Sequence, residues 1–287
     1  MKNVCTALAL LFGGLIMANC HQTPVESPVL VRTESPGNVQ LLDRKFVEFK
    51  GVSFHYSPKI FGNVRLEEID AYPLKEPDWK PDRVAPEHLL FTFDFGREYS
   101  KKAHVSVYPL NKFPKMYSVN PESVKSIEEK IEALGKALND KTYRLEGEIP
   151  HLPFADASQD FHSKVHHFNF ENGKGILFVT HWSHGAGLLS NHNLIYRFEG
   201  LSDDGKFYVT AETPVSVDFL PDESPDEFEG HTYEDLFEDY KVPKSERKRF
   251  DTYINSITSR MEKLNAGDFR PNLETFESLI SSLRIIK

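Results

Sequence analysis

Histidines are the residues of this chain best suited to metal or acid–base chemistry, and half of them lie close together in the sequence. The chain has 12 histidines, of which six lie between His162 and His192. Neutral imidazole is a good ligand for zinc and copper. His166, His181 and His184 are therefore candidate metal ligands, with His162 as a fourth. Because the sequence has no His-Glu-x-x-His motif and no cysteine cluster, we expect no metal cofactor and keep this site as an alternative.

Signals for nucleophilic and carboxylate chemistry are weaker. No Gly-x-Ser-x-Gly segment occurs, and 184–187 (His-Gly-Ala-Gly) is only a fragment of an oxyanion-loop pattern. Between Asp218 and Tyr240 there are ten acidic residues and no lysine or arginine. The ligand order and central glycine of a calcium-binding EF-hand are missing there. We therefore predict a solvated acidic surface in this segment and no catalytic activity for the chain.

Two hairpins must position the clustered histidines. Asn172-Gly173 separates two alternating runs, and this pair is the strongest signal for a two-residue turn. If these two residues form the loop, His166 lies opposite Val179, and His166 and His181 become diagonal neighbours on one face.

A second hairpin with its turn at 202–205 would pair Leu201 with Lys206 and Phe198 with Val209. Two consecutive hairpins predict a four-stranded antiparallel meander.

Apolar periodicity predicts the remaining elements. Alternation indicates strands at 46–49, 52–56, 63–71, 89–95 and 103–107, and the prolines of 72–86 indicate a long loop. Asn120 before Pro121 is a typical helix start, and helical spacing continues to Leu138. Further helices are expected at 243–266 and 273–283, with a short one at 233–240. The chain is therefore expected to be an α+β domain, with an antiparallel sheet of about seven to nine strands packed by amphipathic helices in layers.

The N-terminal segment has the pattern of a secretory signal. Lys2 precedes an apolar run from Val4 to Ala18, which is too short to cross a bilayer comfortably. The end of this run resembles the lipobox of bacterial lipoproteins, in the string Leu15-Ile16-Met17-Ala18-Asn19-Cys20. In that family the cysteine sulfur receives diacylglycerol and becomes the new N-terminus after cleavage. Asn19 stands where the family normally has Gly, Ala or Ser. An ordinary cleaved signal and an uncleaved anchor remain alternatives.

This resemblance divides the chain into a signal peptide at 1–19, a lipidated tether at 20–44 and a single domain at 45–287. Cys5 would be removed with the signal, so the mature chain could form no internal disulfide and must depend on its core. The net charge is −9, and −10 without Lys2. An acidic surface argues against nucleic acid and against electrostatic attachment to anionic lipid.

The second hairpin carries a further resemblance. The run 196–209 (Tyr-Arg-Phe-Glu-Gly-Leu-Ser-Asp-Asp-Gly-Lys-Phe-Tyr-Val), followed by Pro214, is similar to a group of uncharacterised exported bacterial proteins. The segments 51–58 (Gly-Val-Ser-Phe-His-Tyr-Ser-Pro) and 276–283 (Phe-Glu-Ser-Leu-Ile-Ser-Ser-Leu) resemble PsbP-like domains. Those domains have an antiparallel sheet between helical layers, and their known roles are mostly in binding or assembly.

Together these patterns predict a membrane-anchored lipoprotein of the cell envelope, with a non-catalytic binding or assembly domain. Its partner would be an envelope protein or a small molecule. If the host has two membranes, His21 after the cysteine resembles the default that directs lipoproteins to the outer membrane, facing the periplasm. The alternative is an envelope hydrolase or metal-dependent enzyme that uses the histidine-rich segment 162–192.

Overall fold

The computed structural model describes residues 44–75, 83–95, 102–140, 148–154, 157–185, 187–242 and 246–286. Outside these residues lie the predicted signal peptide, nearly all of the tether with Cys20, and Ala186 of the segment 184–187. Among the described residues, none of the helices combines the length and the apolar character needed to cross a membrane.

The centre of the fold is an antiparallel seven-stranded sheet with the strand order β3-β4-β5-β9-β8-β7-β6. Its strands are β3 (Val64–Ile69), β4 (His88–Phe93), β5 (His104–Pro109), β6 (Ser158–Phe170), β7 (Gly173–Ser183), β8 (Leu194–Ser202) and β9 (Phe207–Pro214). The α+β class is confirmed. The four-stranded meander is also present, because β6, β7, β8 and β9 are neighbours in chain order.

The predicted register of the first hairpin is wrong by two residues. Phe170 pairs with Gly173, so that Glu171 and Asn172 form the loop. The Asn172 side chain is used elsewhere: it donates to the carbonyl of Ile285 at 2.6 Å and accepts from the Ile285 amide at 3.0 Å. Gly173 lies inside β7, at a position that requires glycine because a Cβ there would be 1.9 Å from the Phe170 ring.

The second hairpin is also shifted by two residues. Leu201 pairs with Tyr208, and Phe198 pairs with Ala211. The loop is longer than predicted because side chains close it: Asp204 accepts a hydrogen bond from the Ser202 hydroxyl at 2.7 Å. A shift of two residues keeps every side chain on its predicted face, since strand side chains alternate with a period of two.

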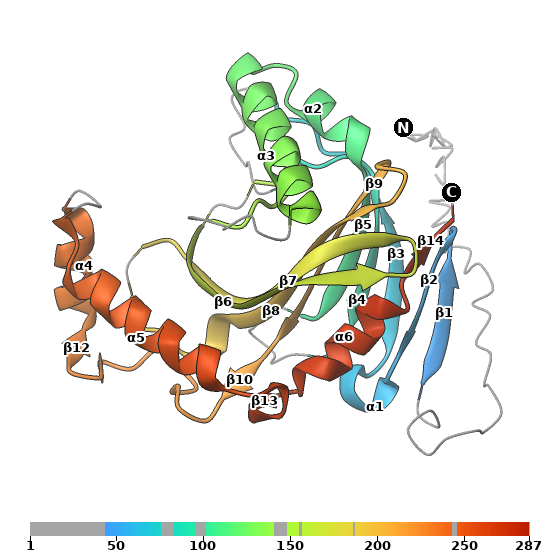
Figure 1. The fold of residues 1–287 in the computed structure, drawn as a ribbon. Coiled ribbons are helices and arrows are strands. Elements are labelled where there is room, and N and C mark those ends of the chain that lie inside the picture. Colours follow the sequence, from blue (N-terminus) through green and yellow to red (C-terminus); the bar gives the residue numbers. More distant parts are fainter. Residues whose placement is uncertain are drawn as a thin grey trace, which may run out of the picture.

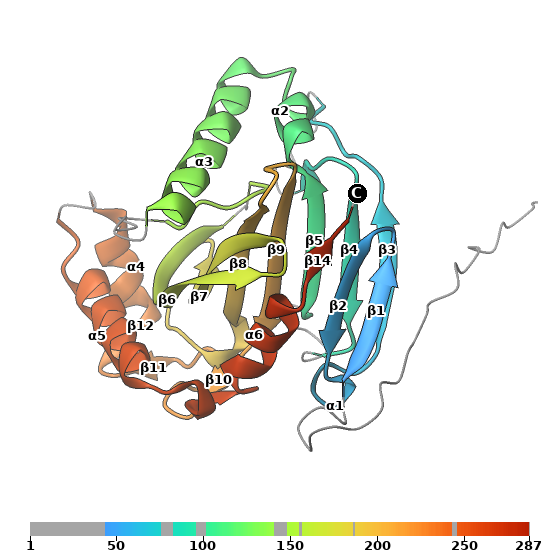
Figure 2. The same ribbon diagram turned by 45° about the vertical axis from the view of Figure 1, so that its right-hand side comes forward.

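One face of the sheet is covered by a small second sheet and two helices (Figures 1 and 2). The small sheet has the order β1-β2-β14, and the helices are α5 and α6. Their bounds are β1 (Lys45–Phe49), β2 (Val52–Tyr56), β14 (Arg284–Ile285), α5 (Arg249–Lys263) and α6 (Leu273–Ser281). The strands predicted at 46–49 and 52–56 are present as β1 and β2, and they pair antiparallel. This face holds the larger apolar core, which includes Phe54, Phe91 and Phe198.

The opposite face carries a smaller apolar core beneath α2 (Phe113–Met116) and α3 (Pro121–Asn139). The helix α3 begins as predicted, because the Asn120 side chain accepts from the Ser123 amide at 3.0 Å. It packs against β7 and β8. Ile127 and Leu134 of its apolar stripe are buried in this core.

The helix expected at 243–266 is shorter than predicted. It begins at Arg249. Asp239 of the preceding helix caps this start by accepting a hydrogen bond from the Phe250 amide at 2.9 Å. It ends at Lys263, because Leu264 adopts an extended backbone. Pro243, the predicted start, lies outside the described residues.

Several short elements complete the chain and were mostly not predicted. They are α1 (Pro58–Phe61), β10 (Ser216–Val217), β11 (Glu227–Phe228), β12 (His231–Thr232) and β13 (Phe269–Arg270). The short helix expected at 233–240 is present as α4 (Tyr233–Lys241).

Close packing around Phe198 generates the first prediction. A Cβ on Gly175 would lie 2.3 Å from the Phe198 ring and 2.6 Å from a backbone carbonyl. Gly175→Ala should therefore lower the free energy of unfolding by about 1–3 kcal/mol, as expected for overpacking. The measurement is urea denaturation.

Gly135 of α3 is the matched control, because a Cβ there meets nothing within 4 Å. Gly135→Ala should raise the free energy of unfolding by up to about 1 kcal/mol through higher helix propensity. Equal effects of the two substitutions would contradict the packing described.

Candidate functional site

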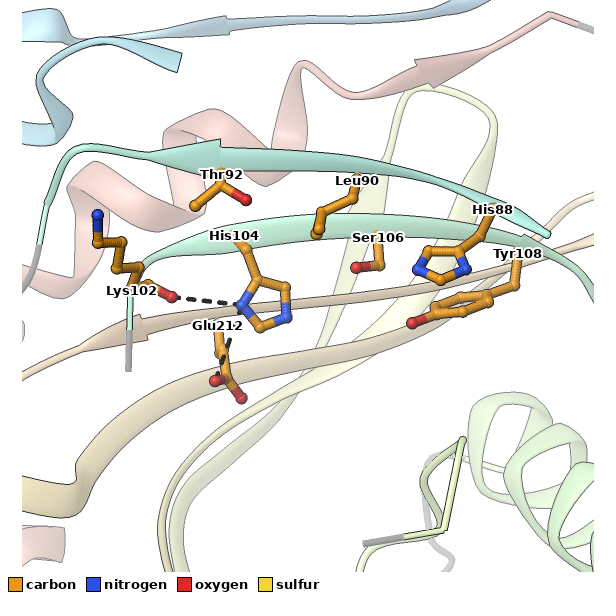
Figure 3. Close-up of a pocket in the computed structure, with 8 residues that line it drawn as sticks. All are labelled: His88, Leu90, Thr92, Lys102, His104, Ser106, Tyr108 and Glu212. Carbon is orange, nitrogen blue, oxygen red and sulfur yellow. Dashed lines mark hydrogen bonds and ion pairs between the residues drawn. The ribbon is translucent and has the colours of Figure 1, made fainter. Parts of the chain in front are cut away.

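A groove of about 410 Å³ lies on the sheet face that carries α3, over strands β4, β5 and β9. It is lined by His88, Leu90, Thr92, Lys102, His104, Ser106, Tyr108 and Glu212 (Figure 3). Alternation along the strands explains the lining. The apolar residues that alternate with them along the strands, such as Leu89, Phe91 and Val105, point to the opposite face and into the larger core.

The register gives the groove a length and two distinct ends. Thr92 pairs with His104, and His104 pairs with Glu212, which places these three side chains at one end. His88 and Tyr108 form the other end, with Leu90 and Ser106 between the two (Figure 3). His88 and Thr92 are four positions apart along β4, a distance of roughly 13 Å.

Backbone carbonyls orient both imidazoles. Nδ1 of His88 lies 2.9 Å from the Pro86 carbonyl oxygen, and Nδ1 of His104 lies 3.3 Å from the Lys102 carbonyl oxygen. When the ring is neutral, such a bond makes Nδ1 the donor and leaves Nε2 as a hydrogen-bond acceptor. Burial lowers the pKa of His88, and nearby His104 lowers it further, while the Pro86 bond opposes them. His88 is thus neutral at pH 7. Its ring stacks on Tyr108 with a ring-centroid distance of 4.2 Å.

A buried charged cluster supports the groove from within the sheet. Arg197 Nε lies 2.5 Å from Glu199 Oε1, and Arg197 Nη1 lies 2.6 Å from Glu212 Oε2. The side chains of Glu199 and Glu212 are 0% and 4% exposed. The Tyr208 hydroxyl donates to the second oxygen of Glu199. Glu212 belongs to both the cluster and the groove, and its Oε1 lies 3.8 Å from His104 Nδ1.

Burial governs the ionisation of this cluster. It raises the pKa of Glu199, although Arg197 and the Tyr208 hydrogen bond oppose the shift. Burial acts to lower the pKa of Arg197, but the two neighbouring carboxylates outweigh it, so the guanidinium stays charged. Burial also raises the pKa of Tyr108 to about 12, so this groove phenol is neutral.

The structure does not bring His166 and His181 together as the sequence predicted. His166 pairs with Leu177, whereas His181 pairs with Phe161, four residues farther along β7. A register shift between Ser163 and His166 contributes to this separation. The predicted diagonal contact is therefore wrong.

His166 and His181 each interact with a different carboxylate instead. His181 is buried and its Nδ1 donates to Asp160 at 2.7 Å, while His166 is half exposed with Nε2 3.6 Å from Glu277. His184 lies in the bend after β7. Burial lowers the pKa of His162, the fourth candidate. Over the ranges that the structure describes, no group of three or more His, Cys, Asp or Glu side chains is arranged to hold a metal ion.

Sequence reasoning did not single out the residues of the groove. His104 and Glu212 are more than 100 positions apart, and β5 and β9 are neighbours only because a long segment between them leaves and returns to the sheet. One signal was present. The pattern Arg197-x-Glu199 lies within a strand whose other residues are mostly apolar, and charged pairs in central strands indicate buried ion pairs.

No protein-family model, curated protein or solved structure matches the chain. The functional argument therefore depends on the groove and its charged cluster. The likeness to lipoproteins and PsbP-like domains stays a prediction from the sequence.

The raised pKa of Glu199 generates the second prediction, on stability against pH. Its pKa in the folded chain lies above the ordinary value of 4.5. Between these values the folded state holds the proton that the unfolded state has released, so its stabilising contribution is lost as pH rises. The free energy of unfolding of the wild type, relative to Glu199→Gln, should fall as pH rises above 4.5 and then level off.

Urea denaturation at a series of pH values measures this difference. Glu128→Gln, on the exposed side of α3, is the control for removing one carboxylate. If the free energy of unfolding of the wild type, relative to that of Glu199→Gln, rises with pH, the raised pKa of Glu199 is contradicted.

Proposed function

We propose that this chain is a membrane-anchored lipoprotein of the cell envelope, and that its domain is a non-catalytic binding module whose ligand site is the groove over β4, β5 and β9. The observation that carries the proposal is a groove whose polar groups are already oriented. The buried pairing of Arg197 with Glu199 and Glu212 holds one of these groups, the Glu212 carboxylate, in place.

Its size and rigidity suit a small ligand. A volume of about 410 Å³ lies within the range of small-molecule sites. His88 and His104 are oriented by backbone carbonyls, and Glu212 is oriented by Arg197. Groups that are ordered before binding lose little conformational entropy when the ligand arrives, which favours affinity.

The anchor follows from the lipobox-like string that ends at Cys20. Two acyl chains on the cysteine would hold the protein at the bilayer, since each buried methylene contributes about 0.8 kcal/mol. A flexible tether of the proposed length has an end-to-end distance of roughly 25 to 30 Å. The domain would then sit close to the membrane, facing the periplasm from the outer membrane in a host with two membranes.

An enzyme that uses the histidine-rich hairpin is the second candidate, and one contact favours it. Asp160 accepts hydrogen bonds from both His181 and Ser183, at 2.7 Å and 2.8 Å. In a catalytic triad, however, the histidine contacts the serine, and the aspartate contacts only the histidine. Here the aspartate lies between the other two, an order that suits structural support better than activation of the serine.

The anchor generates the third prediction. Cys20→Ser should abolish the acyl mass of the protein isolated from host cells, because the thioether to lipid can no longer form. Cys5→Ser is the matched control, since this cysteine lies in the segment that cleavage removes. Intact-mass spectrometry should show a wild-type mature chain that begins at Cys20 with added acyl mass. A mature terminus elsewhere, or one without acyl mass, would remove the basis for the anchor.

The groove generates the fourth prediction. Leu90 lies at its centre, so Leu90→Trp should fill the groove and exclude the ligand. Protein purified from native envelopes, then denatured and analysed by mass spectrometry, should release a small molecule from the wild type and about tenfold less from Leu90→Trp.

The control is Val119→Trp, which adds the same ring at a site that is 52% exposed. Circular dichroism must show that both variants are folded. Equal amounts of the molecule from folded Leu90→Trp and from wild type would place its site away from the groove.

A further inference from the structure

We propose that the outer edge of β3 is an interaction surface for a second copy of this chain. The two copies join as a symmetric dimer in which β3 pairs antiparallel with β3 of the partner, and the register has its centre at Leu66. This inference concerns the edge of the sheet and does not depend on the proposed function of the groove.

The two edges of the seven-stranded sheet differ in how they are protected. The edge strand β6 has two register shifts against β7, and α5 and α6 pack against it. The Lys164 amide of β6 donates to Glu262 of α5 at 2.7 Å. Bulges and covering helices are common means of keeping an edge strand from pairing with another chain. The other edge strand, β3, pairs with β4 over all six residues without a register shift, and among the described residues β4 is the only strand beside it.

The ladder between β3 and β4 shows which backbone groups point outward. The Phe93 amide of β4 donates on the side of β5, to the Ala103 carbonyl at 2.9 Å. Phe93 is the partner of Val64 in the register, so this pair carries no ladder hydrogen bonds. The backbone N–H and C=O groups of Val64 therefore point away from β4. Those of Leu66 do the same, because the direction alternates with a period of two. An added strand binds to groups directed in this way.

The charges of β3 are self-complementary in one register. When Leu66 lies opposite Leu66 of the partner subunit, Arg65 lies opposite the partner's Glu67, and the two-fold symmetry forms this pair twice. Opposite charges directly across an antiparallel pair stabilise it, and like charges destabilise it. A shift of two residues in either direction would place Arg65 or Glu67 opposite its own copy. The charges therefore select a single register.

Arg65 and Glu67 are available for this pairing. Over the ranges that the structure describes, neither side chain forms an ion pair or a hydrogen bond within the chain. Arg65 is exposed and Glu67 is half-buried. Their cross-strand neighbours on β4 are Thr92 and Leu90, which carry no charge.

The opposite face of β3 does not oppose the pairing. Leu66 and Val64 pack there against the larger core as partly buried side chains. Glu68 lies on the same face and pairs with Lys50 of the turn between β1 and β2. In the inferred register Glu68 lies opposite the partner's Val64 and meets no like charge.

A dimer of this kind joins the two seven-stranded sheets into one. Opposite residues of an antiparallel pair point to the same face, so both grooves would lie on the same face of the joined sheet. Two β3 strands would separate the β4 strands of the two copies, which places them about 14 Å apart.

Cysteine cross-linking tests the register. Across the inferred pair, the Cα atoms of position 65 and the partner's position 67 are about 4.5 Å apart, and a disulfide requires about 4.4–6.8 Å. Full-length chains with Arg65→Cys and Glu67→Cys, tagged differently and expressed together, should form a cross-linked dimer on oxidation. Either variant alone should not exceed the wild-type background, because equal positions are roughly 8 Å apart.

Charge reversal tests the pairing by a second route. Sedimentation equilibrium of the full-length chain, in a detergent matched to the solvent density, should give twice the mass of one chain. Arg65→Glu should raise the Kd of the dimer by about tenfold or more, because like charges then lie opposite each other twice. Glu67→Arg should do the same. Combining the two substitutions should restore the affinity, since it only exchanges the charges within each pair.

The control is Glu128→Arg on the exposed side of α3, which reverses one charge away from the edge and should leave the dimer unchanged. Circular dichroism must show that all variants are folded. A wild-type chain that sediments as a monomer at every concentration overturns the inference. So does a dimer that neither single reversal weakens, or cross-linking that is equal in the mixed and the separate samples. The retained molecule is measured separately with Leu90→Trp, so the dimer and the groove can fail independently.

Discussion

The pairing of Arg197 with Glu199 and Glu212 is the interaction on which the polar face of the sheet depends. Removing one partner of a buried ion pair typically costs about 3–5 kcal/mol, because it leaves an uncompensated charge in the interior. The pairing needs the observed register, in which Arg197 lies directly opposite Glu212. A slip of one residue would turn these charges toward the face where Tyr196 and Phe198 are buried. The cluster thus specifies both the register and the sidedness of the meander.

The two faces of the sheet are used differently as a result. One is mainly apolar and is covered by the small sheet, α5 and α6. The other is divided, with an apolar part beneath α3 near β7 and β8 and a polar part over β4, β5 and β9. The groove lies at this division, where Glu212 is buried by the cluster and also lines the groove. A ligand there would contact side chains that the fold has already ordered.

Local patterns were sufficient to predict most elements, and contacts distant in sequence explain what was missed. The start of α3 was predictable because its cap, Asn120, is adjacent to it. The start of α5 was not, because Asp239 from another helix caps it. Asn172-Gly173 suggested a two-residue turn, but Asn172 binds Ile285, more than 100 residues away. The groove was missed for the same reason, since no local pattern connects His104 with Glu212.

The small sheet joins segments that are far apart in the sequence, since β14 completes the sheet that β1 and β2 begin. The strand β14 pairs with β2, with Ile285 opposite Val52, and its other edge is bound by the 171–172 turn. The pairing of Ile285 with Val52 closes a loop of more than 200 residues. Closing so long a loop costs conformational entropy before the contacts that it allows can form, and topologies rich in such contacts fold slowly. The larger core can therefore be completed only after residues 284–285 have been synthesised. Until residues 284–285 are in place, the edge of β2 that they cover lacks its strand partner.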